Sequence, residues 1–167
     1  MPIDGQAILA RLSERFAGKI RETDDFRGDH TAVVDARGIL DVLSFCKEDP
    51  RLRFEILMDL TAVDYLKYAG REESPRFEVV YHLYSLTHNH RVRLKVRVEE
   101  DDAVLASAVS LWPVANWFER EVWDMFGIRF EGHPDLRRLL MYEEFQGHPL
   151  RKEYPKNKRQ PLIGPKN

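Results

Sequence analysis

The chain has 167 residues, which is the length of one domain with its own hydrophobic core. Hydrophobic residues make up 43% of it and charged residues 32%, as in ordinary globular proteins, and no apolar run approaches the ~20 residues of a membrane-spanning helix. The net charge of -2 argues against attraction of the whole protein to nucleic acid, and the single cysteine, Cys46, excludes an internal disulfide.

Hydrophobic spacing predicts two helices and two strands in the first part of the chain. An amphipathic helix follows Asp4, a candidate N-terminal cap, and its apolar positions recur at helical spacing up to Ile20. Residues 30–35 (HTAVVD) predict a short strand, and residues 39–48 (ILDVLSFCKE) predict a helix. Residues 54–63 (FEILMDLTAV) are rich in buried residue types, so they predict a second strand.

The clearest β signal in the sequence is a hairpin. Apolar residues alternate over residues 77–83, a polar turn follows at residues 87–90, and a second alternating run covers residues 91–98. Period two places four cations on one face of the second strand, and these are Arg91, Arg93, Lys95 and Arg97. We expect this to be a solvated outer face rather than a dedicated partner surface.

The second half predicts helices followed by an irregular segment. Residues 103–111 predict a helical stretch, and a further helix is expected from Pro113 to Phe126, with Gly127 at its exit. The order of elements predicts an α+β fold, a single domain with a mainly antiparallel or mixed sheet packed by helices, plus an extended C-terminal arm. Three segments are expected: an α+β globular part (1–126), an arm packed on a partner and on its own helix (127–155), and a basic proline-containing tail (156–167).

One charged residue falls on the apolar side of the helix after Pro113. The helical spacing groups Val114, Trp117, Phe118, Glu121, Val122 and Met125 on one stripe. Glu121 is therefore predicted to be buried, and a buried carboxylate needs a partner. Arginines 120, 129, 137 and 138 are the nearby cations. We favour an internal ion pair that pins the arm to the helix over a proton-handling role, because no second acid lies on this stripe.

The arm contains a repeat. Phe130-x-Gly132-His133-Pro134 returns as Phe145-x-Gly147-His148-Pro149, and each copy is followed by a leucine and a basic pair, Arg137-Arg138 and then Arg151-Lys152. Each histidine precedes a proline, which favours an extended backbone, and no H-E-x-x-H or cysteine pair accompanies them. We therefore favour two structural turns that aim cations at a partner over a pair of metal ligands.

No catalytic, cofactor-binding or metal-binding residues are predicted on this chain. The sequence has no G-x-G-x-x-G, no P-loop and no G-x-S-x-G, and one cysteine cannot hold an iron–sulfur cluster alone. The basic tail has few interleaved aromatic residues, which favours docking on an acidic protein groove over binding single-stranded nucleic acid. A stand-alone metal-dependent enzyme and a nucleic-acid-binding module remain weaker alternatives.

Residues 119–155 carry a family resemblance. EREVWDMFGI (119–128), GHPDLRRLL (132–140) and GHPLRKEYP (147–155) resemble, in order, the signature of the C subunit of NADH-quinone oxidoreductase, the 30-kDa subunit family of respiratory complex I. The chain departs from the pattern after Pro155, where basic residues stand in place of the longer acidic tail of many family members.

The resemblance implies a non-catalytic peripheral-arm subunit of a membrane-bound, proton-translocating complex. Such a subunit lies on the cytoplasmic side of the cell inner membrane, held through its partners, chiefly the D subunit at the quinone site and the neighbouring B and I subunits. The complex uses NADH, FMN, iron–sulfur clusters and a quinone, none of which this chain is expected to bind. The residues then expected to be architectural or interfacial are Glu119, Arg120, Glu121, Asp124, His133, Arg137, Arg138, His148 and Arg151. The nearest alternative is the homologous subunit of a membrane-bound hydrogenase or of an oxidoreductase with another electron donor.

Overall fold

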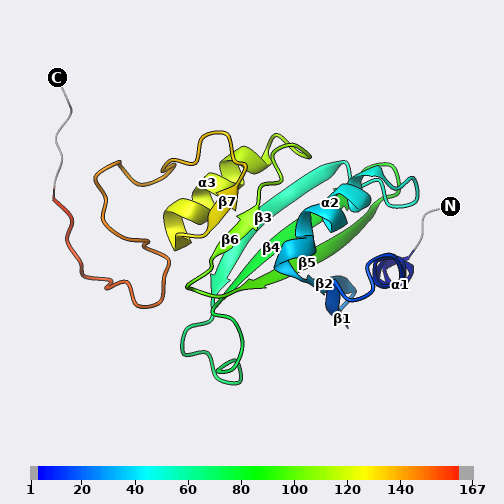
Figure 1. Ribbon diagram of the computed structural model, residues 1–167, viewed down its shortest axis with the longest axis horizontal. Helices are drawn as coiled ribbons and strands as arrows, with labels where there is room; N and C mark the ends of the chain where they lie inside the picture. Colours follow the sequence, from blue (N-terminus) through cyan, green and yellow to red (C-terminus); the bar gives the residue numbers. More distant parts are fainter. Residues whose placement is uncertain (1–3, 162–167) are drawn as a thin grey trace.

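The centre of the protein is a five-stranded mixed sheet, seen in a computed structural model that describes residues 4–161. The strand order is β1-β2-β5-β4-β3, in which β2 and β5 are parallel and the other neighbours are antiparallel. The strands are β1 (Ile20–Phe26), β2 (Asp29–Val34), β3 (Ile56–Asp64), β4 (Phe77–Ser85) and β5 (His90–Val98). The predicted α+β class with a mixed sheet is confirmed (Figure 1).

Three α-helices accompany the sheet, and these are α1 (Gly5–Arg15), α2 (Ile39–Glu48) and α3 (Ala115–Phe126). The Asp4 carboxylate caps α1 by accepting from the N–H of Ala7 at 2.7 Å, and α2 has the bounds that its sequence predicts. A short 3-10 turn, η1 (Ala36–Gly38), leads into α2. The predicted extension of α1 towards Ile20 is wrong, because α1 ends at Arg15 and Ile20 begins β1.

The core lies on the helix-bearing face of the sheet. Alternation along β5 buries Val92, Leu94 and Val96, which join residues of β4 and of the helices in one cluster. Burial of each such side chain contributes about 1.5–3 kcal/mol. The four alternating cations of β5 point to the opposite face, where they pair with Asp29, Glu78 and Glu22. The predicted hairpin is therefore confirmed, and its outer face is an ion-pair network.

The first strand was not predicted, because IRETDDF contains little hydrophobic alternation. It forms through a hairpin with β2, whose two-residue turn consists of Arg27 (φ 56°) and Gly28 (φ 80°). Two consecutive positive φ angles are typical of the tight turn that matches the twist of paired strands. The polar strand is thus positioned by its turn and its partner.

The predicted helix over residues 103–111 is wrong. This segment contains β6 (Val104–Ala106), which pairs in parallel with β7 (Arg129–Glu131). Leu105 and Phe130 lie opposite each other in this pair, and both are buried. A three-residue apolar run has no readable period, and its partner lies far along the chain, so the tertiary pairing decides its structure.

After Glu131 the described chain, up to residue 161, forms no further helix or strand. It runs beside α3 and then extends away from the sheet (Figure 1). Residues 129–131 of the expected arm form β7, so from here on the arm means residues 132–155. The last part of the predicted basic tail, residues 162–167, lies outside the described residues. Among residues 4–161, no helix is both long enough and apolar enough to span a bilayer.

Candidate functional site

The site is built on α3, which the signature EREVWDMFG covers. The helix ends at Gly127, which has φ 80° and donates its N–H to the Trp123 carbonyl at 2.8 Å. Glycine suits this left-handed exit because it has no Cβ, and the exit was predicted from the sequence. The turn directs the chain into β7 and then into the arm, so the arm returns along the helix it has just left.

Asp124 joins the arm to α3. Its carboxylate is fully buried, pairs with Arg138 at 2.6 Å, and accepts the backbone N–H groups of Leu139, Leu140 and Met141 at 3.0, 2.8 and 2.9 Å. Burial acts to raise the pKa of Asp124, but these four donors together hold it below its usual value. One ionised carboxylate therefore fixes three consecutive residues of the arm.

The second copy of the repeat caps the C-terminal end of α3. The last carbonyls of a helix have no partner within it. Here the Asp124 carbonyl accepts from His148 Nδ1 at 3.0 Å, and the Met125 carbonyl accepts from the N–H of Leu150 at 3.1 Å. The Phe126 carbonyl accepts from Arg151 Nε at 2.6 Å. The cation also lies at the negative end of the helix dipole, which is favourable.

The first copy of the repeat contacts the other end of α3. His133 Nε2 donates to the Asn116 carbonyl at 3.1 Å, and its Nδ1 accepts the N–H of Asp135 at 3.0 Å. Both ring nitrogens are therefore engaged in hydrogen bonds within the chain. Arg120 on α3 donates to the carbonyls of Arg137 and Arg138 at 3.1 and 3.0 Å. The two copies thus hold the arm along the length of the helix.

In each basic pair of the repeat, one side chain points into the protein and the other is exposed to solvent. Arg138 and Arg151 turn inward, and Arg138 also donates to the carbonyls of residues 145 and 147 at 2.8 and 3.1 Å. Arg137 is exposed and pairs with Asp135 at 2.9 Å, and Lys152 is exposed. The expectation that both pairs aim their cations at a partner is therefore wrong for Arg138 and Arg151, because uncapped carbonyls and Asp124 attract them inward.

The predicted burial of Glu121 is also wrong. Glu121 is exposed, and the buried carboxylates of α3 are Glu119 and Asp124. The helix presents a second possible stripe, Ala115, Glu119, Val122 and Phe126, and this is the stripe that faces the core. The ion pair that we expected between Glu121 and the arm is made by Asp124 with Arg138 instead.

Glu119 is a buried acid that has no cation partner among residues 4–161. It accepts from the Ser107 hydroxyl at 2.7 Å and from the N–H of Ala108 at 2.6 Å, and it forms no ion pair with the described residues. Burial raises the pKa of Glu119 to about 7, although both hydrogen bonds act to lower it. Burial and the charge of Glu119 likewise raise the pKa of Tyr81. Glu119 therefore ties α3 to the segment after β6 and titrates near neutrality.

A second anchor of the arm was missed by the sequence analysis. The buried Asp64, at the end of β3, accepts from Arg76 at 2.7 Å and from the N–H of Lys152 at 2.8 Å. Arg76 also pairs with Glu100 at 2.7 Å and with Glu153 of the arm. The only sequence signal was a single acid at the end of an apolar strand, which does not reveal a partner 88 residues away.

Replacing Gly127 with alanine is expected to destabilise the isolated chain by about 2–4 kcal/mol, measured by urea unfolding. The added Cβ would lie 2.7 Å from His148 Nε2 and 2.8 Å from Arg151 Nη2, in a backbone with φ 80°. Gly132→Ala is the matched control, because Gly132 has φ 83° but no atom within 4 Å of the added Cβ. It should cost only about 1–2 kcal/mol. Equal losses for the two variants would show that His148 and Arg151 do not pack against Gly127.

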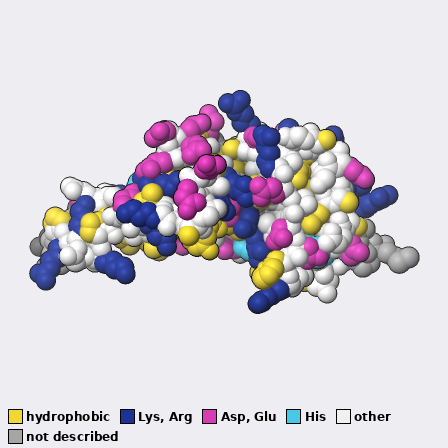
Figure 2. Space-filling model, turned by 90° about the horizontal axis from the view of Figure 1, so that it is seen from below, with side chains coloured by type: hydrophobic (Ala, Val, Ile, Leu, Met, Phe, Trp, Pro, Cys, Tyr) yellow, Lys and Arg dark blue, Asp and Glu magenta, His cyan; other side chains and the backbone are white. Residues whose placement is uncertain are grey.

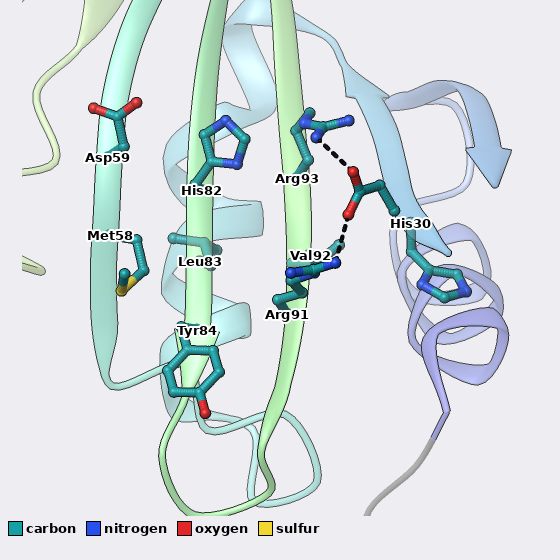
Figure 3. Close-up of a pocket in the computed structure, with 10 residues that line it drawn as sticks. His30, Met58, Asp59, His82, Leu83, Tyr84, Arg91, Val92 and Arg93 are labelled. Carbon is teal, nitrogen blue, oxygen red and sulfur yellow. Dashed lines mark hydrogen bonds and ion pairs between the residues drawn. The ribbon is translucent and has the colours of Figure 1, made fainter. Parts of the chain in front are cut away.

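The face of the sheet opposite the core carries a hollow of about 460 Å³ over β3, β4 and β5 (Figure 3). Arg91 and Arg93 both bind the Asp29 carboxylate there, at 2.9 and 3.2 Å, and burial lowers the pKa of His82. The described residues that line it include no serine, threonine, cysteine or lysine. Within residues 4–161 no three His, Cys, Asp or Glu side chains are grouped to hold a metal ion. The hollow thus combines the shared ion pair of Arg91 and Arg93 with Asp29 and apolar walls from residues such as Met58 and Val92.

The fold and the site define a class of protein: a small α+β domain with a mixed sheet, whose C-terminal arm is held on its own signature helix. The family model described as "Respiratory-chain NADH dehydrogenase, 30 Kd subunit" matches residues 32–160. The chain belongs to this family.

The alignments with similar proteins and solved structures extend over most of the chain. The chain is 49% identical over 155 residues to the C subunit of NADH-quinone oxidoreductase from Roseiflexus sp. (strain RS-1), covering 93% of this chain and 86% of that protein. It is 52% identical over 151 residues to the protein of the same name from Caulobacter vibrioides, covering 90% and 71%. Among solved structures, a trypsin-resistant fragment of Nqo5 matches with a TM-score of 0.69 and 34% identity, over 78% of this chain and 98% of that one. A chain of an archaeal membrane-bound sulfane sulfur reductase matches with a TM-score of 0.72 and 26% identity, over 92% and 86%.

Proposed function

We propose that this chain is a non-catalytic subunit of a membrane-bound NADH-quinone oxidoreductase, and that its arm is a rigid element for docking on other subunits. The observation that carries the proposal is the way the signature residues are used. Asp124, Arg138, His148 and Arg151 direct their polar groups into contacts within the chain. They therefore define the shape of an arm and leave its outer side for contact with a partner.

The proposal extends to the reaction that the whole complex catalyses. The complex passes electrons from NADH through FMN and iron–sulfur clusters to a quinone and couples this transfer to proton translocation. Other subunits hold these cofactors, and this chain contacts the D subunit at the quinone site and the neighbouring B and I subunits. It is located on the cytoplasmic side of the inner membrane through these partners. The names of the relatives and the family membership support this assignment.

The match to the sulfane sulfur reductase favours a second candidate. That protein is described as an archaeal respiratory membrane complex, so a chain with this fold also occurs beside a different electron-transfer chemistry. The second candidate is therefore the corresponding subunit of a related membrane complex with another electron donor or acceptor, including a membrane-bound hydrogenase.

Nucleic-acid binding receives little support. The side of the molecule seen in Figure 2 carries acidic and basic side chains next to one another, with no basic surface across it. This agrees with the net charge of -2. A nucleic-acid surface instead requires cations clustered on one face.

Affinity purification through a tag on this chain distinguishes the candidates. We expect the flavin-binding, NADH-binding and quinone-site subunits to copurify, with NADH-dependent quinone reduction in the eluate. A nickel–iron large subunit or a sulfur-reducing subunit would support the second candidate. Recovery of the chain alone from solubilised membranes would refute both.

The two arginines of the first basic pair should give different results when they are replaced singly. Arg138→Ala removes the partner of the buried Asp124, so it should destabilise the isolated chain by about 3 kcal/mol and thereby lower the amount of assembled complex. Arg137→Ala alters an exposed ion pair and should change the stability of the chain by less than about 1 kcal/mol. Urea unfolding and quantitative immunoblots of the complex measure the two effects. Similar destabilisation by both variants would contradict the inward position of Arg138.

A further inference from the structure

Two apolar residues at the start of α3, Val114 at its N-cap and Trp117 in its first turn, point away from the core. Val114 and Trp117 are 42% and 56% exposed, and Glu121 is also exposed. Their spacing of three and four residues places them on one line along the helix. Of the stripe predicted from the sequence, Val122 and Met125 are buried in the core and Phe118 packs against it, whereas Val114, Trp117 and Glu121 stay exposed. The exposed part of this stripe is therefore a pair of apolar residues, Val114 and Trp117, followed by the carboxylate of Glu121.

Arg120 links Trp117 to the arm. The guanidinium of Arg120 lies 5.2 Å from the centre of the Trp117 ring. Arg120 is 9% exposed and is itself fixed by the carbonyls of Arg137 and Arg138. Tryptophan offers a large apolar area with only two side-chain torsions to order, and it is enriched among the residues that dominate interface energies. The exposed indole thus has the properties of an interface anchor.

Glu121 supplies a charge beside this anchor. It follows Trp117 by one helical turn and forms no hydrogen bond or ion pair with any residue in the described part of the chain. The nearby exposed cation, Arg137, is already neutralised by Asp135 at 2.9 Å. Arg120, which lies beside Trp117, is only 9% exposed, so the exposed and unpaired charge of this surface is that of Glu121, which fits a lysine or arginine of a partner.

We propose that Val114, Trp117 and Glu121 form a docking stripe for another subunit of the same complex, which supplies an apolar recess for Trp117 and a cation for Glu121. The stripe is continuous with the arm, because Arg120 contacts both Trp117 and the arm carbonyls. The inference rests on the proposed function and deepens it. It assigns the partner contact to the outer side of α3 and leaves the inward arginines to shape the arm.

The test uses the tagged chain, purified from membranes with its complex. Trp117→Ala and Glu121→Lys should each lower the amount of copurifying subunits per chain by roughly tenfold. Glu121→Gln should cause a smaller loss and should weaken the dependence of retention on salt concentration. Phe26→Ala is the matched control, because Phe26 is 62% exposed and has the Arg27 guanidinium 5.0 Å from its ring, but lies on β1. It should behave as the unaltered chain does.

The outcomes separate this inference from the proposed function. Thermal unfolding of the purified chain reports whether each variant is folded, and Glu121→Lys alters an exposed residue without partners among residues 4–161. Full retention of the other subunits by both Trp117→Ala and Glu121→Lys would overturn the docking stripe and leave the proposed function standing. Absence of other subunits from the unaltered chain would refute the proposed function. A dimer of the purified chain that Trp117→Ala abolishes would assign the stripe to a second copy and overturn the inference.

Discussion

Replacing Asp124 with alanine should release the arm from α3 and destabilise the isolated chain by about 3–5 kcal/mol. The substitution leaves the guanidinium of Arg138, which is 14% exposed, without its carboxylate. It also removes the acceptor of three backbone N–H groups, those of Leu139, Leu140 and Met141. Urea unfolding measures the loss of stability, and trypsin digestion should cleave the variant faster after residues 137 and 138.

Glu121→Ala is the control for this experiment, because it removes a carboxylate from the same helix where that carboxylate is exposed and unpaired within residues 4–161. Its effect on stability should stay within about 0.5 kcal/mol. A double variant, Asp124→Ala with Arg138→Ala, should be less destabilised than the sum of the two single variants, because the two side chains are coupled. If Asp124→Ala resembled Glu121→Ala in stability and in proteolysis, the proposed attachment of the arm would be wrong.

The second large effect is a dependence of stability on pH that is centred on Glu119. Its folded-state pKa of about 7 lies above its usual value of 4.5. The folded protein therefore binds this proton more tightly than the unfolded chain does, and the associated stability is complete below about pH 4.5. That stability is lost as the pH rises through about 7. Between about pH 5.5 and pH 8.5, Glu119 alone should account for a loss of about 2 kcal/mol.

Glu119→Gln isolates this contribution, because glutamine keeps the size of the side chain and can hydrogen-bond Ser107 and Ala108 without ionising. The stability difference between the unaltered chain and Glu119→Gln, measured by urea unfolding at each pH, should shift by about 2 kcal/mol in favour of the variant at the higher pH. Glu121→Gln makes the same substitution at an exposed glutamate of the same helix and is the matched control. Parallel pH profiles for the unaltered chain and Glu119→Gln would show that Glu119 does not take up a proton on folding.

Local signals in the sequence predicted the elements that local interactions determine. The bounds of α2, the exit of α3 at Gly127 and the β4–β5 hairpin all follow from periodicity and from residues with special backbone preferences. β1, β6 and β7 were not predicted. β1 is polar and depends on its turn with β2, and β6 depends on a parallel partner that follows it after α3. Their structure comes from tertiary pairing, which overrides weak local preference.

The candidate site, like the fold, could be predicted from the sequence only in part. The repeat and the signature helix drew attention to α3 and the arm, where Asp124, Arg138 and His148 make their contacts, but the hydrophobic pattern of α3 allows two stripes, each containing one glutamate. The sequence cannot decide between Glu119 and Glu121, because the choice depends on which side of the helix meets β3 and on the hydrogen bonds that Ser107 and Ala108 offer. The inward position of Arg138 and Arg151 likewise depends on uncapped carbonyls that only the folded helix presents.

Hydrogen exchange of the arm in the isolated chain tests the central claim most directly, because it reports whether the arm is held by its own helix before any partner binds. The amides of Leu139, Leu140 and Met141 donate to Asp124, and that of Leu150 donates to the Met125 carbonyl. We predict that these amides exchange at least about a hundredfold more slowly than in an unstructured peptide, and that Asp124→Ala removes the protection at residues 139–141. Exchange at the rate of an unstructured peptide in the unaltered chain would contradict the account.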